Sequence, residues 1–373
     1  MDRQIVDRSW HILIVLVASF LPSNDLLPYV EYFIRTSNNT LSHELMERCS
    51  RYLEICKKVG NRKEPPSIEE IDMLLSDSCR QITVRILPND ELPMEITMLA
   101  QSRDVIEQIN RELKLGKGGR MFQLFKVRDS SRNEEVLLNE NSRMTDILAT
   151  MQEGESLLFA IAYYNSSYDL HNANLLRLLF FQAVHDLRAG RYFKPDEDYF
   201  TLTALALQES LQDYSGDNRV VCEAIAKLLP PHLCVPARKL VCEGEVLKVY
   251  NKLRGYTSHE CMIALLDYIT SWEDYGVTHF YGDQFAPEQQ DGKIIGISPR
   301  GVHVGEYADH VGKDAYTQFY PYSAISAWGL SENSLSFYLA TKPEQRHYQF
   351  VMPHPDAAYS LIQHYSQLVV CSK

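Results

Sequence analysis

The chain has 373 residues, of which 45% are hydrophobic and 23% charged, which is typical of folded globular proteins and excludes wholesale disorder. At about 150 residues per domain, this length predicts two to three domains. The net charge of −12 argues against DNA or RNA as the main ligand, because binding a polyanion depends on positive charge. Eight cysteines without a C-x-x-C pair do not make a disulfide scaffold and favour a reduced, cytoplasmic compartment.

An apolar stretch near the N-terminus, Ile12–Leu21, has two competing interpretations. It is too short to span a bilayer but has the length of a signal-peptide core. A signal peptide begins with a basic segment, whereas here two acidic residues balance two basic ones before the stretch. We therefore predict a buried helix, with a signal peptide as the minor alternative.

Helices are predicted throughout residues 1–80. One covers about 26–35, and Ser67 with Glu70 has the spacing of a capping box that opens the last one. Between them, residues 45–59 place their apolar side chains on one helical face. These side chains are Leu45, Cys49, Tyr52, Leu53, Cys56 and Val59.

From Gln81 the pattern changes to alternation, and strands and helices are mixed as far as residue 165. The predicted order is two strands, a helix, two strands, a short helix and a last strand, which is the order of a ubiquitin-like roll. The predicted strands are 82–86, 94–98, 121–127, 135–138 and 157–163, and the helices are 105–113 and 144–151.

Residues 166–272 return to helical periodicity. Leu175–Leu187 is apolar on nearly every side, so we predict a central, buried helix there, followed by an amphipathic helix near 200–211. Further helices are predicted at 220–229, 240–253 and 258–272.

The last part of the chain alternates again and ends in a helix that opens at Pro355. Its short strands and single closing helix follow the plan of a pleckstrin-homology or phosphotyrosine-binding barrel. The predicted strands are 277–281, 293–297, 302–306, 316–320, 323–328, 335–339 and 348–351.

Four short stretches support a family resemblance. They are Arg8–Trp10 followed by Pro22-Ser23, Asn61–Ile71, Gly190–Tyr192 and Lys293–Val304. With the order of the elements, they resemble a MyTH4 domain (myosin tail homology, type 4) followed by a FERM domain. This pair forms the cargo-binding tail of unconventional myosins and of the plant kinesin-like calmodulin-binding motor, and the sequence leaves open which of the two parents applies.

The resemblance implies a multidomain α+β chain in which a helical domain precedes a FERM cloverleaf. The implied domains are a partial MyTH4 domain at 1–80, a ubiquitin-like roll at 81–165, a helical bundle at 166–272 and a pleckstrin-homology/phosphotyrosine-binding-like barrel at 273–373. In this family the MyTH4 domain begins well before the Arg-x-Trp stretch, whereas about ten residues precede Trp10 here. We therefore expect a fragment or a shortened domain, and do not carry over a microtubule-binding role.

No arrangement of residues indicates catalysis. Gly116–Gly119 has no Ser or Thr after its lysine, so it is predicted to be a flexible loop rather than a phosphate-binding loop. His43 lacks a second histidine four residues on, and Cys49 and Cys56 are predicted to be core cysteines rather than metal ligands. We predict no enzyme activity, no catalytic residue, no metal site and no cofactor.

A peptide-binding groove is predicted between the fifth strand of the barrel and the C-terminal helix, as in phosphotyrosine-binding barrels. An exposed strand edge offers unpaired backbone groups to an incoming peptide, and small residues let its backbone approach. The predicted groove residues are Ser323, Ala324, Ile325, Ser326, Ala327, Trp328, Ile362 and Tyr365. The alternative is that Ile325, Trp328 and Ile362 belong to the barrel core.

Anionic lipid is expected to be a weak ligand. Residues 81–165 carry 10 Lys and Arg against 13 Asp and Glu, and residues 273–373 carry 6 against 11. The candidate lipid or anion contact is a small basic cluster of Lys114, Lys117 and Arg120.

The predicted function is that of a non-catalytic cargo- and adaptor-binding tail module of a cytoskeletal motor, located in the cytoplasm with the cytoskeleton. The expected partners are tails of cargo or adaptor proteins. The chain's own motor, a neighbouring tail segment and a cytoskeletal filament are further candidates. The alternative is a FERM protein that links membrane and cytoskeleton without a motor, and a FERM-containing enzyme fragment is the least supported class.

Overall fold

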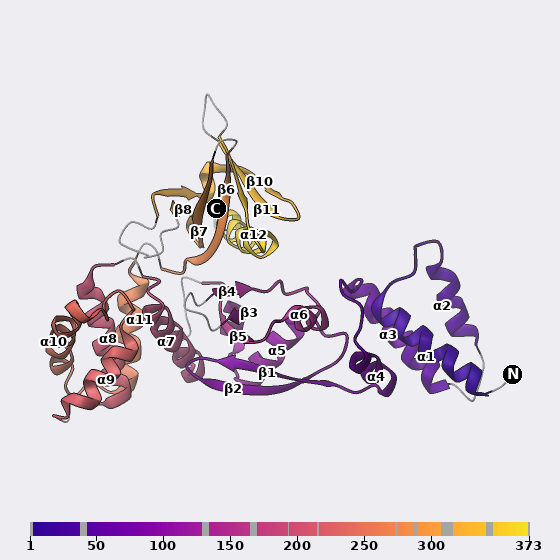
Figure 1. The fold of residues 1–373 in the computed structure, drawn as a ribbon, viewed down its shortest axis with the longest axis horizontal. Helices are drawn as coiled ribbons and strands as arrows, with labels where there is room; N and C mark the ends of the chain where they lie inside the picture. The colour runs from indigo at the N-terminus through magenta and orange to yellow at the C-terminus, as the bar shows by residue number, and fades with distance from the viewer. Residues whose placement is uncertain are drawn as a thin grey trace. The chain divides into compact units, whose positions relative to one another are not determined.

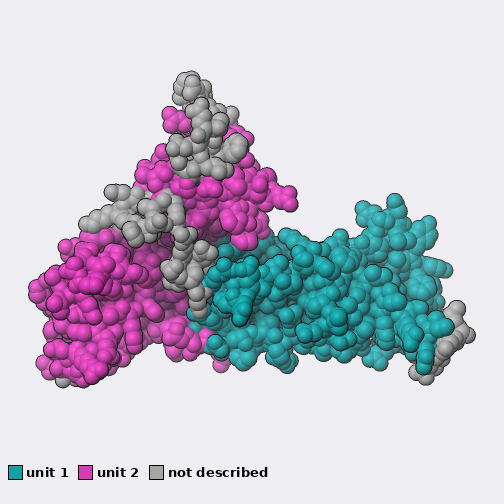
Figure 2. All heavy atoms as spheres, viewed as in Figure 1, with its two compact units in different colours: residues 1–86, 91–109, 124–158 teal, residues 87–90, 110–123, 159–373 magenta. Residues whose placement is uncertain are grey.

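The computed structural model describes most of the chain and divides it into two compact units, coloured separately in Figure 2. The described residues are 3–371 except 38–42, 129–133, 165–169, 193, 215, 273–274, 287–288, 307–315 and 341–345. Unit 1 comprises 1–86, 91–109 and 124–158, and unit 2 comprises 87–90, 110–123 and 159–373. Among the described helices, none has the length and apolar character that crossing a membrane requires.

The N-terminal part is helical, as predicted (Figure 1). Its helices are α1 (Arg3–Ser19), α2 (Leu27–Thr36), α3 (His43–Val59) and α4 (Ile68–Ser76). The predicted capping box of α4 is present, because Ser67 accepts a hydrogen bond from the Glu70 N–H and the Glu70 carboxylate accepts one from the Ser67 N–H.

Helix α1 is buried on one face only, which corrects the prediction of a buried helix. Trp10, Ile14 and Val17 lie in the core with α3 and α4. On the other face Ile12 is 63% and Leu16 is 52% exposed. The apolar sequence therefore formed a helix as expected, but the described helices cover only one side of it.

A five-stranded sheet follows, in the predicted order of elements. Its strands are β1 (Arg80–Ile86), β2 (Asp90–Ile96), β3 (Phe122–Arg128), β4 (Glu134–Leu137) and β5 (Glu155–Ile161), arranged β2-β1-β5-β3-β4. The helices are α5 (Ser102–Glu112) and α6 (Met144–Thr150). Val105, Ile106 and Ile109 of α5 are buried, as its periodicity predicted.

The glycine-rich segment before β3 is ordered, and the prediction of a flexible loop there was wrong. It forms a 3₁₀ helix, η1 (Gly116–Met121). A Cβ atom on Gly118 would lie 2.4 Å from Leu175 Cδ2, and one on Gly119 would lie 2.5 Å from Asn110 Cγ. The glycines thus allow close packing rather than mobility.

The helical bundle consists of α7 to α11. These helices are α7 (Ala173–Arg188), α8 (Asp196–Leu211), α9 (Asn218–Leu228), α10 (Pro236–Lys252) and α11 (Ser258–Thr270). Helix α7 is largely buried, as predicted, but α8 contacts each of the other four and buries nearly every side chain between Tyr199 and Gln208. The helix predicted to be amphipathic is therefore the central one.

The C-terminal part is a seven-stranded sheet with one helix, also as predicted. Its strands are β6 (Thr278–Ala286), β7 (Gln289–Ser298), β8 (Gly301–Glu306), β9 (Gln318–Pro321), β10 (Ile325–Leu330), β11 (Ser334–Leu339) and β12 (His347–Val351). They are arranged β10-β11-β12-β6-β7-β8-β9, and helix α12 (Pro355–Cys371) packs against β7, β10 and β11. The predicted domain boundary at 165/166, and residue 273 of the boundary at 272/273, lie outside the described part.

Candidate functional site

Strand β10 is an edge strand, and this makes it the candidate site for a partner. It lies at one end of the seven-stranded sheet, and among the described strands it pairs with β11 alone. Ser326 and Ala327 in its middle are exposed. An edge strand with small exposed residues presents backbone N–H and C=O groups that another strand can pair with.

The register of β10 with β11 shows which amides face the free edge. The Ser331 N–H donates to the Ser334 carbonyl at the hairpin turn (2.9 Å), so this is a hydrogen-bonded pair. Because such pairs alternate along an antiparallel ladder, the amides of Ala327 and Gly329 face β11. The amides of Trp328 and Leu330 then point to the free edge.

A β-bulge interrupts the first half of the strand. The register with β11 shifts between Ile325 and Ala327. Ser326 lies in this bulge, and its hydroxyl donates to the Tyr338 carbonyl (3.0 Å). Regular pairing with an added strand is therefore confined to the stretch around Trp328 and Leu330.

Four of the predicted groove residues are not where the sequence placed them. Ser323 and Ala324 precede the strand, in the short 3₁₀ helix η2 (Tyr322–Ala324). Ile362 and Tyr365 of α12 are fully buried at 0% exposure, so they cannot line an open groove. The prediction failed there because the buried side of α12 is set by how the helix packs on the sheet.

Trp328 lies partly in an aromatic cluster. Its ring centroid is 5.8 Å from that of Phe337, which is fully buried, and 6.1 Å from that of Tyr322. The Tyr322 hydroxyl donates to the Ser298 carbonyl (2.8 Å), and burial raises the pKa of Tyr322. The Trp328 side chain is thus held in place by the core while its amide faces the edge. The packing of the ring agrees with the core interpretation, and a role of Trp328 in a binding site stays a prediction.

The basic cluster lies in unit 2, around the start of η1. Lys114 adopts a left-handed backbone conformation after α5 (φ 54°), and its carbonyl accepts a hydrogen bond from Asn172 Nδ2 (3.0 Å). Lys117 and Arg120 are in η1, and all three side chains are exposed. Their role in anion or lipid contact stays a prediction.

Metal chemistry has no support in the described part of the chain. There, no group of three or more His, Cys, Asp or Glu residues is arranged to hold a metal ion. Cys49 and Cys56 are both fully buried in the helical core, and burial raises the pKa of Cys49 to about 12. This placement agrees with the interpretation of both as core residues.

Sequence reasoning missed the role of Tyr365. Its hydroxyl accepts a hydrogen bond from the Tyr164 N–H (2.8 Å) and donates one to the Ala162 carbonyl (3.1 Å). The residue therefore ties α12 to the segment that follows β5. No local pattern indicates a contact between residues about 200 positions apart in sequence.

Comparison with protein families identifies the kind of chain. Residues 1–73 match the MyTH4 domain, and residues 165–280 match the FERM central domain. A MyTH4 match is thus followed by a match to the central part of a FERM domain, which confirms the resemblance inferred from sequence.

Two relatives of the chain are a kinesin-like protein and an unconventional myosin. Kinesin-like protein KIN-14E of Arabidopsis thaliana is 24% identical over 334 residues, which cover 81% of this chain and 26% of the relative. Unconventional myosin-VIIb of Mus musculus is 22% identical over 351 residues, which cover 90% of this chain and 16% of the relative. The chain therefore spans about a quarter or less of the length of these relatives.

Solved structures share the fold. The MyTH4-FERM MF2 domain of Dictyostelium discoideum myosin VII matches with a TM-score of 0.76 and 16% identity, covering 98% of this chain and 76% of that one. The C-terminal MyTH4-FERM domain of human myosin 7b, solved in complex with the harmonin-a PDZ3 domain, matches with a TM-score of 0.68 and 21% identity. The match covers 99% of this chain and 76% of that one. The complex of the FERM and C-terminal domains of Drosophila merlin matches with a TM-score of 0.58 and 14% identity, covering 77% of this chain and 95% of that one. These likenesses confirm the multidomain α+β fold class.

Proposed function

We propose that this chain is a protein-binding tail module of a cytoskeletal motor and that the β10 edge takes a strand from a cargo or adaptor protein. The observation that carries the proposal is the position of β10, which is exposed at Ser326 and Ala327 and has no pairing strand on one side within the described part of the chain. The motor context is supported by the relatives, which are a kinesin-like protein and a myosin. They favour the motor over a linker protein without one, and they suggest association with the cytoskeleton.

Backbone pairing supplies most of the affinity in this proposal. The free edge offers the N–H and C=O groups of Trp328 and Leu330, so the added strand pairs over a short stretch. Such a peptide reaches micromolar affinity, about −8 kcal/mol. The surrounding residues 273–373 carry 6 basic and 11 acidic side chains, so a partner with Lys or Arg associates faster at low salt. Catalysis has no part in this function.

Replacing Leu330 with proline is expected to abolish peptide binding. Proline removes the amide hydrogen that faces the free edge, while the ladder to β11 stays intact because that amide does not take part in it. The matched control is Leu330→Ala, which removes the same side chain but keeps the N–H. Peptides selected from a displayed random library on the wild-type chain are then measured by fluorescence anisotropy on all three proteins.

The expected result is at least a tenfold loss of affinity for Leu330→Pro and a change of less than threefold for Leu330→Ala. Circular dichroism and thermal unfolding establish that both variants are folded. Equal binding by a folded Leu330→Pro variant would move the site away from β10. If selection on the wild-type chain yields no peptide that binds, strand capture as such is wrong.

A further inference from the structure

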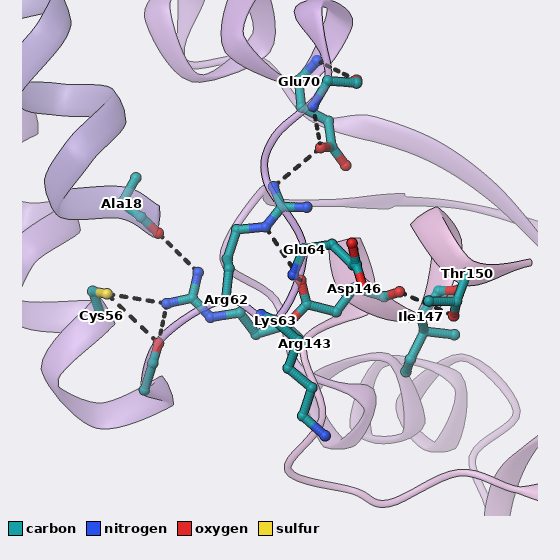
Figure 3. A network of polar contacts seen from close by, with 12 residues as sticks. Ala18, Cys56, Arg62, Lys63, Glu64, Glu70, Arg143, Asp146, Ile147 and Thr150 are labelled. Carbon is teal, nitrogen blue, oxygen red and sulfur yellow. Dashed lines mark hydrogen bonds and ion pairs between the residues drawn. The ribbon is translucent and has the colours of Figure 1, made fainter. Parts of the chain in front are cut away.

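A group of buried charged side chains lies between the N-terminal helices and α6, all within unit 1 (Figure 3). Arg62, from the connection between α3 and α4, donates from Nε to Asp146 Oδ1 on α6 (3.2 Å) and from Nη1 to Glu70 Oε2 (3.0 Å). The side chains of Arg62, Asp146 and Glu70 are 3%, 12% and 4% exposed. Charges with so little access to water depend on one another for compensation.

Asp146 holds more than the Arg62 side chain. Its Oδ2 accepts a hydrogen bond from the Lys63 N–H (3.0 Å), and its Oδ1 accepts one from the Glu64 N–H (3.5 Å). One carboxylate therefore binds three consecutive residues of the connection after α3. No residue between 62 and 64 can move away from α6 without breaking a bond to Asp146.

Arg143, which precedes α6, binds the ends of two N-terminal helices. It donates from Nη1 to the Ala18 carbonyl near the end of α1 (2.8 Å). From Nη2 it donates to Cys56 Sγ near the end of α3 (3.0 Å) and to the Gly60 carbonyl. Arg143 as a whole is buried, with 3% of its surface exposed. In Figure 3 its contacts lie on the helical side, whereas those of Asp146 lie toward the connection.

The group is not fully compensated. It contains two buried positive charges (Arg62 and Arg143) and two negative ones (Glu70 and Asp146), and the partly exposed Arg80, at 31%, adds a third positive charge that pairs with Glu70 (3.0 Å). Several buried polar atoms nearby have no partner among the described residues. They are Ser19 Oγ, Arg62 Nη2, Gln101 Oε1, Ser102 Oγ, Arg143 Nε and Thr145 Oγ1. A partly satisfied network of buried polar groups contributes more to the specificity of the fold than to its stability. Removing one member of such a network is strongly destabilising, because its partners are left buried without compensation.

We propose that Arg62, Asp146 and Arg143 form a clamp that makes the N-terminal helices and the sheet side of unit 1 open as one cooperative unit. The proposal is independent of the function proposed for β10. Loss of the Asp146 charge removes the ion pair with Arg62, which keeps Glu70 as its ion-pair partner, and weakens the hold on residues 63 and 64. The helices then open more readily than the sheet, because only the Arg143 bonds of the clamp, to Ala18, Cys56 and Gly60, still link the two.

Hydrogen exchange measured by mass spectrometry tests this clamp. In the wild-type chain, peptides from α3 and peptides from β1 and β2 are expected to share one opening equilibrium. Asp146→Asn and Arg62→Met are each expected to lower the protection of α3 peptides about a hundredfold. The protection of β1 and β2 peptides is expected to fall by no more than about tenfold. The matched control is Glu44→Gln, which removes an exposed ion pair with Arg48 (3.2 Å) and is expected to change neither set.

The double variant Arg62→Met/Asp146→Asn separates a clamp from two independent contacts. It removes both charges and leaves Glu70 paired with Arg80, so its loss of protection is expected to be at least tenfold smaller than the product of the two single losses. Unequal opening of α3 and β1–β2 in the wild-type chain overturns the proposal. A single variant that lowers the protection of α3 peptides and of β1 and β2 peptides equally also overturns it. The same holds for a double variant whose loss of protection equals the product of the two single losses. Asparagine can still accept the Lys63 hydrogen bond, so Asp146→Asn is the variant chosen to stay folded.

Discussion

Replacing Tyr365 with phenylalanine is expected to lower the free energy of unfolding by about 1–3 kcal/mol, although only one oxygen atom is lost. That hydroxyl accepts from the Tyr164 N–H and donates to the Ala162 carbonyl, and the residue is fully buried. Phenylalanine keeps the packing of the ring but removes one hydrogen bond from each of two buried backbone groups. Tyr365→Ala adds the loss of the ring and is expected to cost about 3–5 kcal/mol.

Urea unfolding followed by circular dichroism and tryptophan fluorescence measures both variants. Tyr359→Phe is the control, because Tyr359 lies half-buried on the same helix and its replacement is expected to change stability by no more than about 0.5 kcal/mol. The experiment also separates two roles for Tyr365. A residue that lined a peptide pocket would change affinity and leave stability intact, so a stable Tyr365→Phe variant with weakened peptide binding would contradict the structural role.

Features that depend on local sequence could be predicted. The capping box of Ser67 and Glu70 needs only two residues three positions apart, and the structure shows both of its hydrogen bonds. The alternation in 82–86 and the apolar face of 45–59 likewise report a half-buried strand and helix, because the periods of the two elements differ. The order of these elements, rather than any single motif, led to the MyTH4–FERM resemblance.

Features that depend on packing could not be predicted. The helical periodicity of α12 indicates an apolar side, but it does not tell whether Ile362 faces a groove or the core, and the structure places it in the core. Ser323 and Ala324 continue an alternating pattern, yet they turn in a 3₁₀ helix before β10. Arg62 and Asp146 are 84 positions apart, so no spacing rule could have joined them.

The glycines of η1 show how a composition rule can mislead. A run with three glycines in four residues is typical of a flexible loop, because glycine has the greatest backbone freedom. Here Gly118 and Gly119 are needed for the opposite reason, since a side chain would clash with Leu175 and Asn110. The Asn110 carboxamide also donates to the Gly119 carbonyl (3.1 Å), which fixes η1 against the end of α5.

Gly119→Ala is therefore expected to lower the free energy of unfolding by about 1–3 kcal/mol, because the new methyl group would displace Asn110 and break its hydrogen bond. Gly118→Ala is expected to cost a similar amount, since the Leu175 side chain is 1% exposed and has little room to move. The matched control is Gly244→Ala in α10, where no heavy atom lies within 4 Å of the added Cβ. Alanine favours a helix over glycine, so this control is expected to gain about 0.5–1 kcal/mol.

Thermal and urea unfolding of the three alanine variants distinguish packing from flexibility. If η1 were a loose loop, all three substitutions would be neutral or stabilising, because alanine restricts the unfolded chain more than glycine does. Loss of stability at Gly118 and Gly119 with a gain at Gly244 is the result expected from close packing. Since Lys117 and Arg120 are carried on the same 3₁₀ helix, it would also mean that these exposed cations are held in fixed positions.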